Sequence, residues 1–167
     1  MKSKPARSGL DLKPWHPAAV IATGFGAGRL PAMPGSWGSL AALPFAWGLK
    51  SAFGTLGLAF AAGLAFGVGS WAAGAVAKAS GAPDPGIVVI DEVMGQFLSL
   101  LPTPRDPAAY ALAFLLFRLF DIGKPWPIGC VDRRIGGGFG IMLDDALAAV
   151  YALAAQLAIG GVFGVRP

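Results

Sequence analysis

Charge is what this sequence has least of. Only 13% of its 167 residues are charged, whereas 55% are hydrophobic and the mean hydropathy is +0.64. Soluble domains usually carry about 25% charged residues, so this chain has too few to cover a water-facing surface. A soluble protein with buried core helices is therefore the disfavoured alternative, and the composition predicts a membrane-embedded chain of one domain.

Cysteine and histidine are nearly absent, which excludes several chemistries. Cys130 is the only cysteine and His16 the only histidine, so neither an internal disulfide nor a Cys/His zinc site can form. Gly136 stands where the arginine of a C-x5-R phosphatase motif would be. Phosphatases with a histidine nucleophile need more than one histidine, and the sequence has neither a D-x-D motif nor a phosphate-binding P-loop.

Long uncharged runs are present, at residues 51–77 and 146–165. A bilayer span needs about 20 apolar residues, so both runs qualify. Residues 1–13 form a polar tail with four basic residues and one acid, and no signal peptide follows. The basic tail favours a cytoplasmic N-terminus, and the net charge of +4 suits an anionic lipid surface. Nucleic-acid binding is not expected, because the basic residues are scattered.

The apolar segments are long and rich in Ala and Leu, which predicts an all-α fold, a multihelical membrane-embedded bundle. A single helical domain is expected over residues 14–167. Residues 23–39 contain so many glycines and prolines that we expect a loop there. Helices are predicted at 14–29 (a short entry helix), about 38–50, 52–79, 87–101, 108–121 and 143–163, and a long connection at 123–140.

Acidic residues are few, and their placement is informative. Of nine acids, five lie at the boundaries of apolar segments: Asp91, Glu92, Asp121, Asp144 and Asp145. A carboxylate at the edge of hydrocarbon is costly unless it is paired or binds a metal. We therefore predict that these five share one site as metal ligands and as the group that orients a water. A site made of oxygen ligands suits Mg²⁺.

Basic and hydroxyl residues near these acids are candidates for binding phosphate. Arg118 and Lys124 flank Asp121 and are the main candidates, although Arg118 and Asp121, three residues apart, could be only a helix-surface ion pair. Further candidates are Arg29, Arg133, Ser36 and Ser39. The two serines fall in the glycine-rich 23–39 segment, whose backbone N–H groups could bind phosphate, or which could be a simple turn.

Two other kinds of protein remain open at this point. A membrane transporter or ion-binding protein could also carry intramembrane carboxylates. Its acids would more often lie in the middle of a span, whereas here they lie near the ends, close to Arg and Lys. The other alternative is a helical interaction protein without catalysis.

Four sequence blocks together resemble the phosphatidylglycerophosphatase A family. They are PWH (Pro14–His16), GFGAGRLPAMPGSWGSLAALP (Gly24–Pro44), IVVIDEVMGQ (Ile87–Gln96) and FRLFDIGKPWPIGCVDRRIGGGFGIMLDD (Phe117–Asp145). Ser36 stands where the family pattern has Thr, and both carry a hydroxyl.

The resemblance implies Mg²⁺-dependent hydrolysis of phosphatidylglycerophosphate to phosphatidylglycerol and inorganic phosphate. It also implies a multi-pass enzyme of the bacterial cytoplasmic membrane with its active site facing the cytoplasm. The expected partner is a phospholipid substrate, and nothing in the sequence indicates a protein partner.

Overall fold

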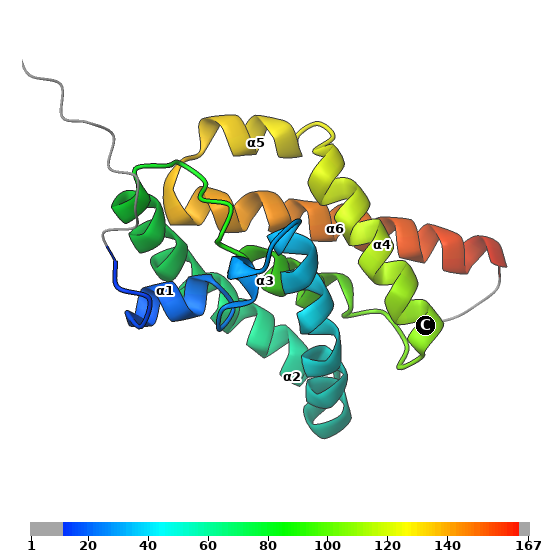
Figure 1. Ribbon diagram of the computed structural model, residues 1–167. Coiled ribbons are helices and arrows are strands. Elements are labelled where there is room, and N and C mark those ends of the chain that lie inside the picture. The colour runs from blue at the N-terminus through cyan, green and yellow to red at the C-terminus, as the bar shows by residue number, and fades with distance from the viewer. Residues whose placement is uncertain (1–11, 164–167) are drawn as a thin grey trace, which may run out of the picture.

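Helices make up all the regular structure between residues 12 and 163, the part of the chain that the computed structural model describes (Figure 1). The elements are α1 (Pro17–Ala22), η1 (Ala27–Arg29), α2 (Pro34–Ser80), α3 (Ile90–Ser99), α4 (Pro107–Gly123), α5 (Ile128–Arg134) and α6 (Gly137–Phe163). The all-α prediction is therefore confirmed. Most of the predicted polar tail, residues 1–11, lies outside the described residues.

Helix α2 is broken at Gly54 into two segments. Gly54 has φ 67° and ψ −168°, a conformation that side-chain-bearing residues rarely adopt. The first segment runs down in Figure 1, and after the break the second runs back up to the left, so the two form a V. The two helices predicted at 38–50 and 52–79 thus exist, separated by a break rather than by a loop.

Two of the described helices, α2 and α6, are long and apolar enough to cross a membrane. A core helix of a soluble protein can meet the same test, but it would be largely buried. Here only 17% of the apolar window of α2 is buried. Phe53, Leu56 and Phe60 on this helix are 70%, 85% and 75% exposed. Large apolar side chains in such number favour an apolar surrounding over water.

Helix α3 lies at the centre of the bundle, packed against α2, α4 and α6 (Figure 1). Small residues let the backbones approach closely. A Cβ on Gly38 of α2 would lie 2.8 Å from the Cβ of Val89, and one on Gly95 of α3 would lie 2.5 Å from the ring of Phe117. Substitution of either glycine would push the helices apart. This packing fixes the N-terminal end of α3 between the other three helices.

Two segments predicted as irregular are partly helical. Residues 34–39 form the start of α2, because Pro34 is a favourable first helical residue and the glycines that follow pack against α3. Residues 123–140 contain α5 and the start of α6. Ile128 of α5 is fully buried, so tertiary packing stabilises a seven-residue helix that its sequence alone does not favour.

The remaining boundaries shift for local reasons. The entry helix covers only 17–22, because glycines 24 and 26 adopt positive φ and turn the chain before η1. Helix α3 ends at Ser99, shorter than predicted, and α4 extends to Gly123, where the left-handed Lys124 ends it.

Candidate active site

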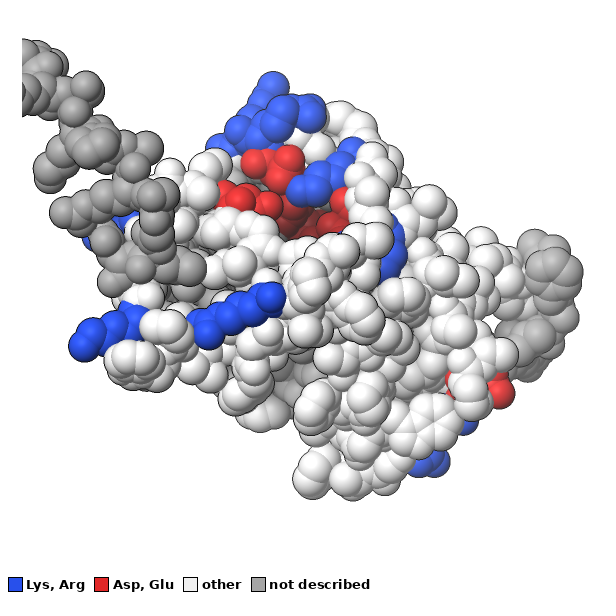
Figure 2. All heavy atoms as spheres, viewed as in Figure 1, with Lys and Arg blue, Asp and Glu red and all other residues white. Residues whose placement is uncertain are grey.

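A pocket of about 310 Å³ opens where the start of α2, the start of α3, the end of α4 and α6 meet. In Figure 2 its acidic side chains lie in a hollow bordered by basic ones. The side chains that give the pocket its charge are Asp84, Asp91, Glu92, Arg118, Asp121, Lys124, Asp144 and Asp145. The structure therefore brings together all five acids and both main cations that the sequence singled out.

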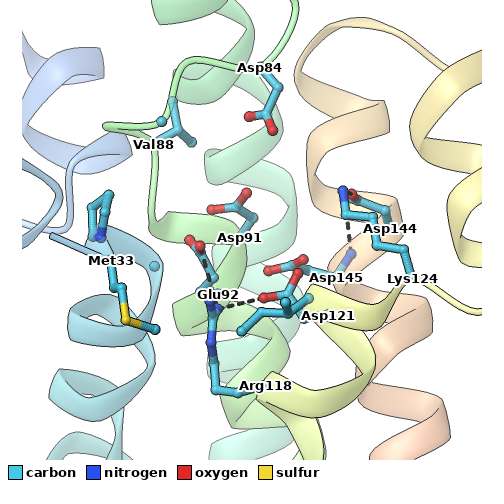
Figure 3. Close-up of a pocket in the computed structure, with 14 residues that line it drawn as sticks. Met33, Asp84, Val88, Asp91, Glu92, Arg118, Asp121, Lys124, Asp144 and Asp145 are labelled. Carbon is cyan, nitrogen blue, oxygen red and sulfur yellow. Dashed lines mark hydrogen bonds and ion pairs between the residues drawn. The ribbon is translucent and has the colours of Figure 1, made fainter.

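Three acids form the centre of the pocket (Figure 3). Asp91 and Glu92 lie in the first turn of α3 and Asp145 projects from α6. One carboxylate oxygen of each lies within 4.8 Å of the others. One oxygen on each, Asp91 Oδ1, Glu92 Oε2 and Asp145 Oδ2, is buried without a hydrogen-bond partner. Buried unpaired carboxylates are costly, so this donor set fits a hard divalent cation such as Mg²⁺.

Burial makes ionisation of the two α3 acids difficult. Burial raises the pKa of Asp91 to about 6. It also raises the pKa of Glu92 well above its ordinary value, and the neighbouring charge of Asp91 raises it further. A cation bound between the two would favour the ionised forms and so reverse this effect.

Arg118 and Asp121 form an ion pair on α4, with 2.5 Å between Arg118 Nη1 and Asp121 Oδ2. Arg118 Nη1 also lies 3.6 Å from Glu92 Oε1. The alternative of a helix-surface ion pair is wrong, because both side chains are mostly buried and face the pocket (Figure 3). The guanidinium is thus held beside the three central acids.

Lys124 binds a second pair of acids. Its Nζ lies 2.7 Å from Asp144 Oδ2 and 2.6 Å from Asp132 Oδ1. Burial alone lowers the pKa of Lys124, but the hydrogen bonds to the two carboxylates raise it above its ordinary value. Lys124 has left-handed backbone angles at the end of α4, which turn it towards Asp144 rather than towards Asp121. Arg118 therefore pairs with acids of α3 and α4, whereas Lys124 pairs with acids of α5 and α6.

Four predicted phosphate-binding residues do not line the pocket: Arg29, Arg133, Ser36 and Ser39. Arg29 donates to the carbonyl oxygen of Pro14 at 3.2 Å. Ser39 is buried and donates to the carbonyl oxygen of Gly35 at 3.0 Å, as expected inside a helix. Arg133 is exposed on α5. The serines lie on a helix rather than in a loop, which removes the reason for proposing them.

Sequence reasoning missed two contributors to the site. Asp84, in the connection between α2 and α3, lines this pocket and an adjoining hollow of about 330 Å³. Its place among only nine acids, just before the Asp91–Glu92 pair, was a usable signal. Gly35 was not predictable from one sequence. A Cβ there would lie 1.8 Å from Glu92 Oε1, so any side chain at this position would displace the carboxylate.

Comparison with known proteins agrees with this arrangement. A sequence model described as phosphatidylglycerophosphatase A matches residues 20–160, which contain every charged residue of the pocket. The chain belongs to the phosphatidylglycerophosphatase A family. The resemblance predicted from the sequence is confirmed, and with it the enzyme class, a phosphoric monoester hydrolase.

Curated relatives cover nearly the whole chain. A phosphatidylglycerophosphatase A from Escherichia coli strain K12 is 38% identical over 164 residues, covering 93% of this chain and 89% of the relative. One from Haemophilus influenzae is 39% identical and covers 86% and 89%. A Bacteroides thetaiotaomicron protein, provisionally named a phosphatidylinositol-3-phosphatase, is 37% identical and covers 80% and 87%. No solved structure matches this member of the phosphatidylglycerophosphatase A family.

Proposed function

We propose that this protein hydrolyses phosphatidylglycerophosphate to phosphatidylglycerol and inorganic phosphate, and that the reaction requires Mg²⁺. The observation that carries the proposal is the set of three carboxylates, Asp91, Glu92 and Asp145, with buried unpartnered oxygens beside two cations. The names of the Escherichia coli and Haemophilus influenzae relatives support the substrate.

The charged side chains then have different roles. Asp91, Glu92 and Asp145 hold Mg²⁺, which when bound neutralises charge on the phosphate and activates or orients a water. Arg118 and Lys124 bind the phosphate oxygens, since both are directed into the pocket. Asp121 holds Arg118 in place, and Asp144 does the same for Lys124.

The reaction needs a proton acceptor as well as positive charge. Water attacks phosphorus, the bond from phosphorus to the glycerol oxygen breaks, and the glycerol oxygen takes up a proton. Three carboxylates of the pocket lie outside the group of three: Asp84, Asp121 and Asp144. Of these, Asp121 and Asp144 are the pair that contacts the two cations proposed to bind the phosphate. We assign the proton transfers to this pair, because a carboxylate within reach of the pocket can serve as base and then as acid.

We also propose that the enzyme lies in the bacterial cytoplasmic membrane with its active site facing the cytoplasm. The two long apolar helices and the exposed aromatic side chains of α2 support a membrane location. The basic character of residues 1–13 supports the orientation. The transporter alternative is not favoured, because the chain belongs to a phosphatase family and its acids lie in one pocket with two cations.

The test is phosphate release by the detergent-solubilised full chain, with Mg²⁺ or with EDTA. The substrates are phosphatidylglycerophosphate, phosphatidic acid, phosphatidylinositol 3-phosphate and a soluble phosphate ester. We expect phosphatidylglycerophosphate to give the highest kcat/KM and EDTA to abolish turnover. Equal rates with EDTA would overturn the metal requirement. Preference for a phosphoinositide, as the name of the Bacteroides relative suggests for that protein, would overturn the substrate assignment.

A further inference from the structure

The pocket has an apolar side as well as a charged one. Met33 and Pro34, at the start of α2, and Ile122, at the end of α4, line it together with the buried acids. Met33 and Ile122 are each 64% exposed, so they form part of the mouth rather than of the floor. In Figure 3 Met33 extends along the side of the pocket that holds Arg118. A site for phosphate alone would have no need of exposed apolar side chains here.

Ile122 belongs to a longer apolar stripe on α4. Leu115, Leu119 and Ile122 are spaced i, i+4 and i+7, which places them on one face of the helix. They are 62%, 63% and 64% exposed, whereas Phe117 on the opposite face is fully buried. The stripe begins at the pocket mouth and leads away from it for about 10 Å, at a rise of about 1.5 Å per residue.

We propose that the glycerol backbone of the lipid substrate leaves the pocket between Met33 and Ile122, and that an acyl chain lies along Leu119 and Leu115. Ile122 would then be a specificity-determining residue, the first contact beyond the phosphate. This inference rests on the proposed function, because it assigns a place to the apolar part of the same substrate.

The continuity of the stripe with the pocket favours a lipid over a protein partner. Arg118, which faces the acids, is adjacent in sequence to Leu119 of the stripe, so one helix presents a cation to the phosphate and an apolar face to the chain. A molecule with a phosphate at one end and a hydrocarbon chain at the other matches both features at once. A protein partner on α4 would have no reason to be joined to the phosphate site.

The test compares two substrates that differ only in chain length, dimyristoyl and dihexanoyl phosphatidylglycerophosphate, both presented in detergent micelles. For Leu115→Asn we expect the ratio of kcat/KM for the long-chain to the short-chain lipid to fall about tenfold, because only the longer chain reaches this end of the stripe and loses an apolar contact. Most of the fall should be in KM. Leu119→Asn should lower the ratio in the same direction. Ile122→Asn should instead lower kcat/KM for both lipids alike, because the glycerol backbone that passes Ile122 is common to both.

Leu157→Asn is the matched control. Leu157 is 50% exposed on α6 and does not line the pocket, so this variant introduces the same polar group elsewhere on the apolar surface. Its ratio should equal that of the unaltered enzyme. An unchanged ratio in both Leu115→Asn and Leu119→Asn, with lipid hydrolysis intact, would overturn the chain path alone. An unaltered enzyme that releases no phosphate from either lipid would overturn the proposed function, and the chain path with it.

Discussion

The two ends of α3 differ in whether their hydrogen-bond acceptors have partners within the chain. At the N-terminal end, Asp91 and Glu92 have buried oxygens without hydrogen-bond partners. At the C-terminal end, Lys50 Nζ donates to the carbonyl oxygens of Leu100 at 3.0 Å and Thr103 at 2.7 Å, and also to that of Leu101. The N-terminal end leaves carboxylate oxygens free for a ligand, whereas at the C-terminal end Lys50 satisfies backbone carbonyl oxygens from within the chain.

A second set of hydrogen bonds completes the C-terminal end. Thr103 Oγ1 donates to Gln156 Oε1 at 2.7 Å, and Gln156 Nε2 donates to the carbonyl oxygen of Ser99 at 2.9 Å. The last carbonyls of a helix have no partner within it, and in an apolar surrounding they must find donors elsewhere. The satisfied end is therefore a structural anchor for α3, which keeps the unsatisfied end in position for binding.

The comparison predicts that a variant at the acidic end loses activity without losing stability. Asp145→Asn should lower kcat/KM by more than about a hundredfold, since loss of even an outer partner of a metal ligand costs 10–100-fold. In EDTA its thermal midpoint should at least equal that of the unaltered chain, because a buried unpaired charge is removed. Phosphate release and thermal unfolding in detergent measure the two effects.

Asp106→Asn is the control for this variant. Asp106 caps α4, accepting from the backbone N–H of Ala109 at 2.8 Å, and Asn is an equally good cap. It should keep both activity and stability. If Asp145→Asn kept near-normal turnover, the acidic end would have no catalytic function.

The opposite pattern is expected at the C-terminal end. Lys50→Met should lower the free energy of unfolding by about 2 kcal/mol, because it leaves the carbonyl oxygens of Leu101 and Thr103 without a donor. The kcat of the folded fraction should change little. Lys78→Met is the matched control, because Lys78 lies exposed near the other end of the same helix. Equal thermal midpoints for the two variants would contradict the structural role of Lys50.

A smaller loss of activity is expected from a substitution where α2 approaches the acidic end of α3. Gly35→Ala would place a Cβ 1.8 Å from the present position of Glu92 Oε1, so Glu92 must move. We expect kcat/KM to fall about tenfold, the lower end of the cost for disturbing a metal ligand. A Cβ on Gly48, in the same helix, meets nothing within 4 Å, so Gly48→Ala should retain full activity. Similar activities would show that the position of Glu92 does not matter.

The smallest expected effect is a loss of stability at the C-terminal end of α3. Thr103→Val keeps the shape of the side chain but removes the hydroxyl that donates to Gln156, so stability should fall by about 1 kcal/mol. Chemical denaturation in detergent would measure this. A variant as stable as the unaltered chain would mean that Gln156 finds another partner.

Much of the site could be predicted because charge is scarce in this sequence. Asp91, Glu92, Asp121, Asp144 and Asp145 interrupt apolar segments, and the structure gathers all five in one pocket. Their division into a central group of three and two ion-paired acids could not be predicted, because it depends on how α3, α4 and α6 pack. No pattern in the sequence reports the backbone angles that turn a side chain such as that of Lys124.

The errors in the fold share one cause. Glycines at 35 and 38 suggested a loop, yet they lie in a helix and serve close packing against α3. Residues 128–134 also seemed irregular, although burial of Ile128 stabilises a helix there. In both places tertiary contacts outweigh local propensity, and a single sequence carries no direct signal of such contacts.

Calorimetric titration of Mg²⁺ into the detergent-solubilised, EDTA-treated chain tests the central claim most directly. We predict saturable binding by the unaltered protein and its loss in Asp91→Asn, since Asp91 supplies one of the three central carboxylates. Equal binding by both proteins, or no binding by the unaltered one, would contradict the account.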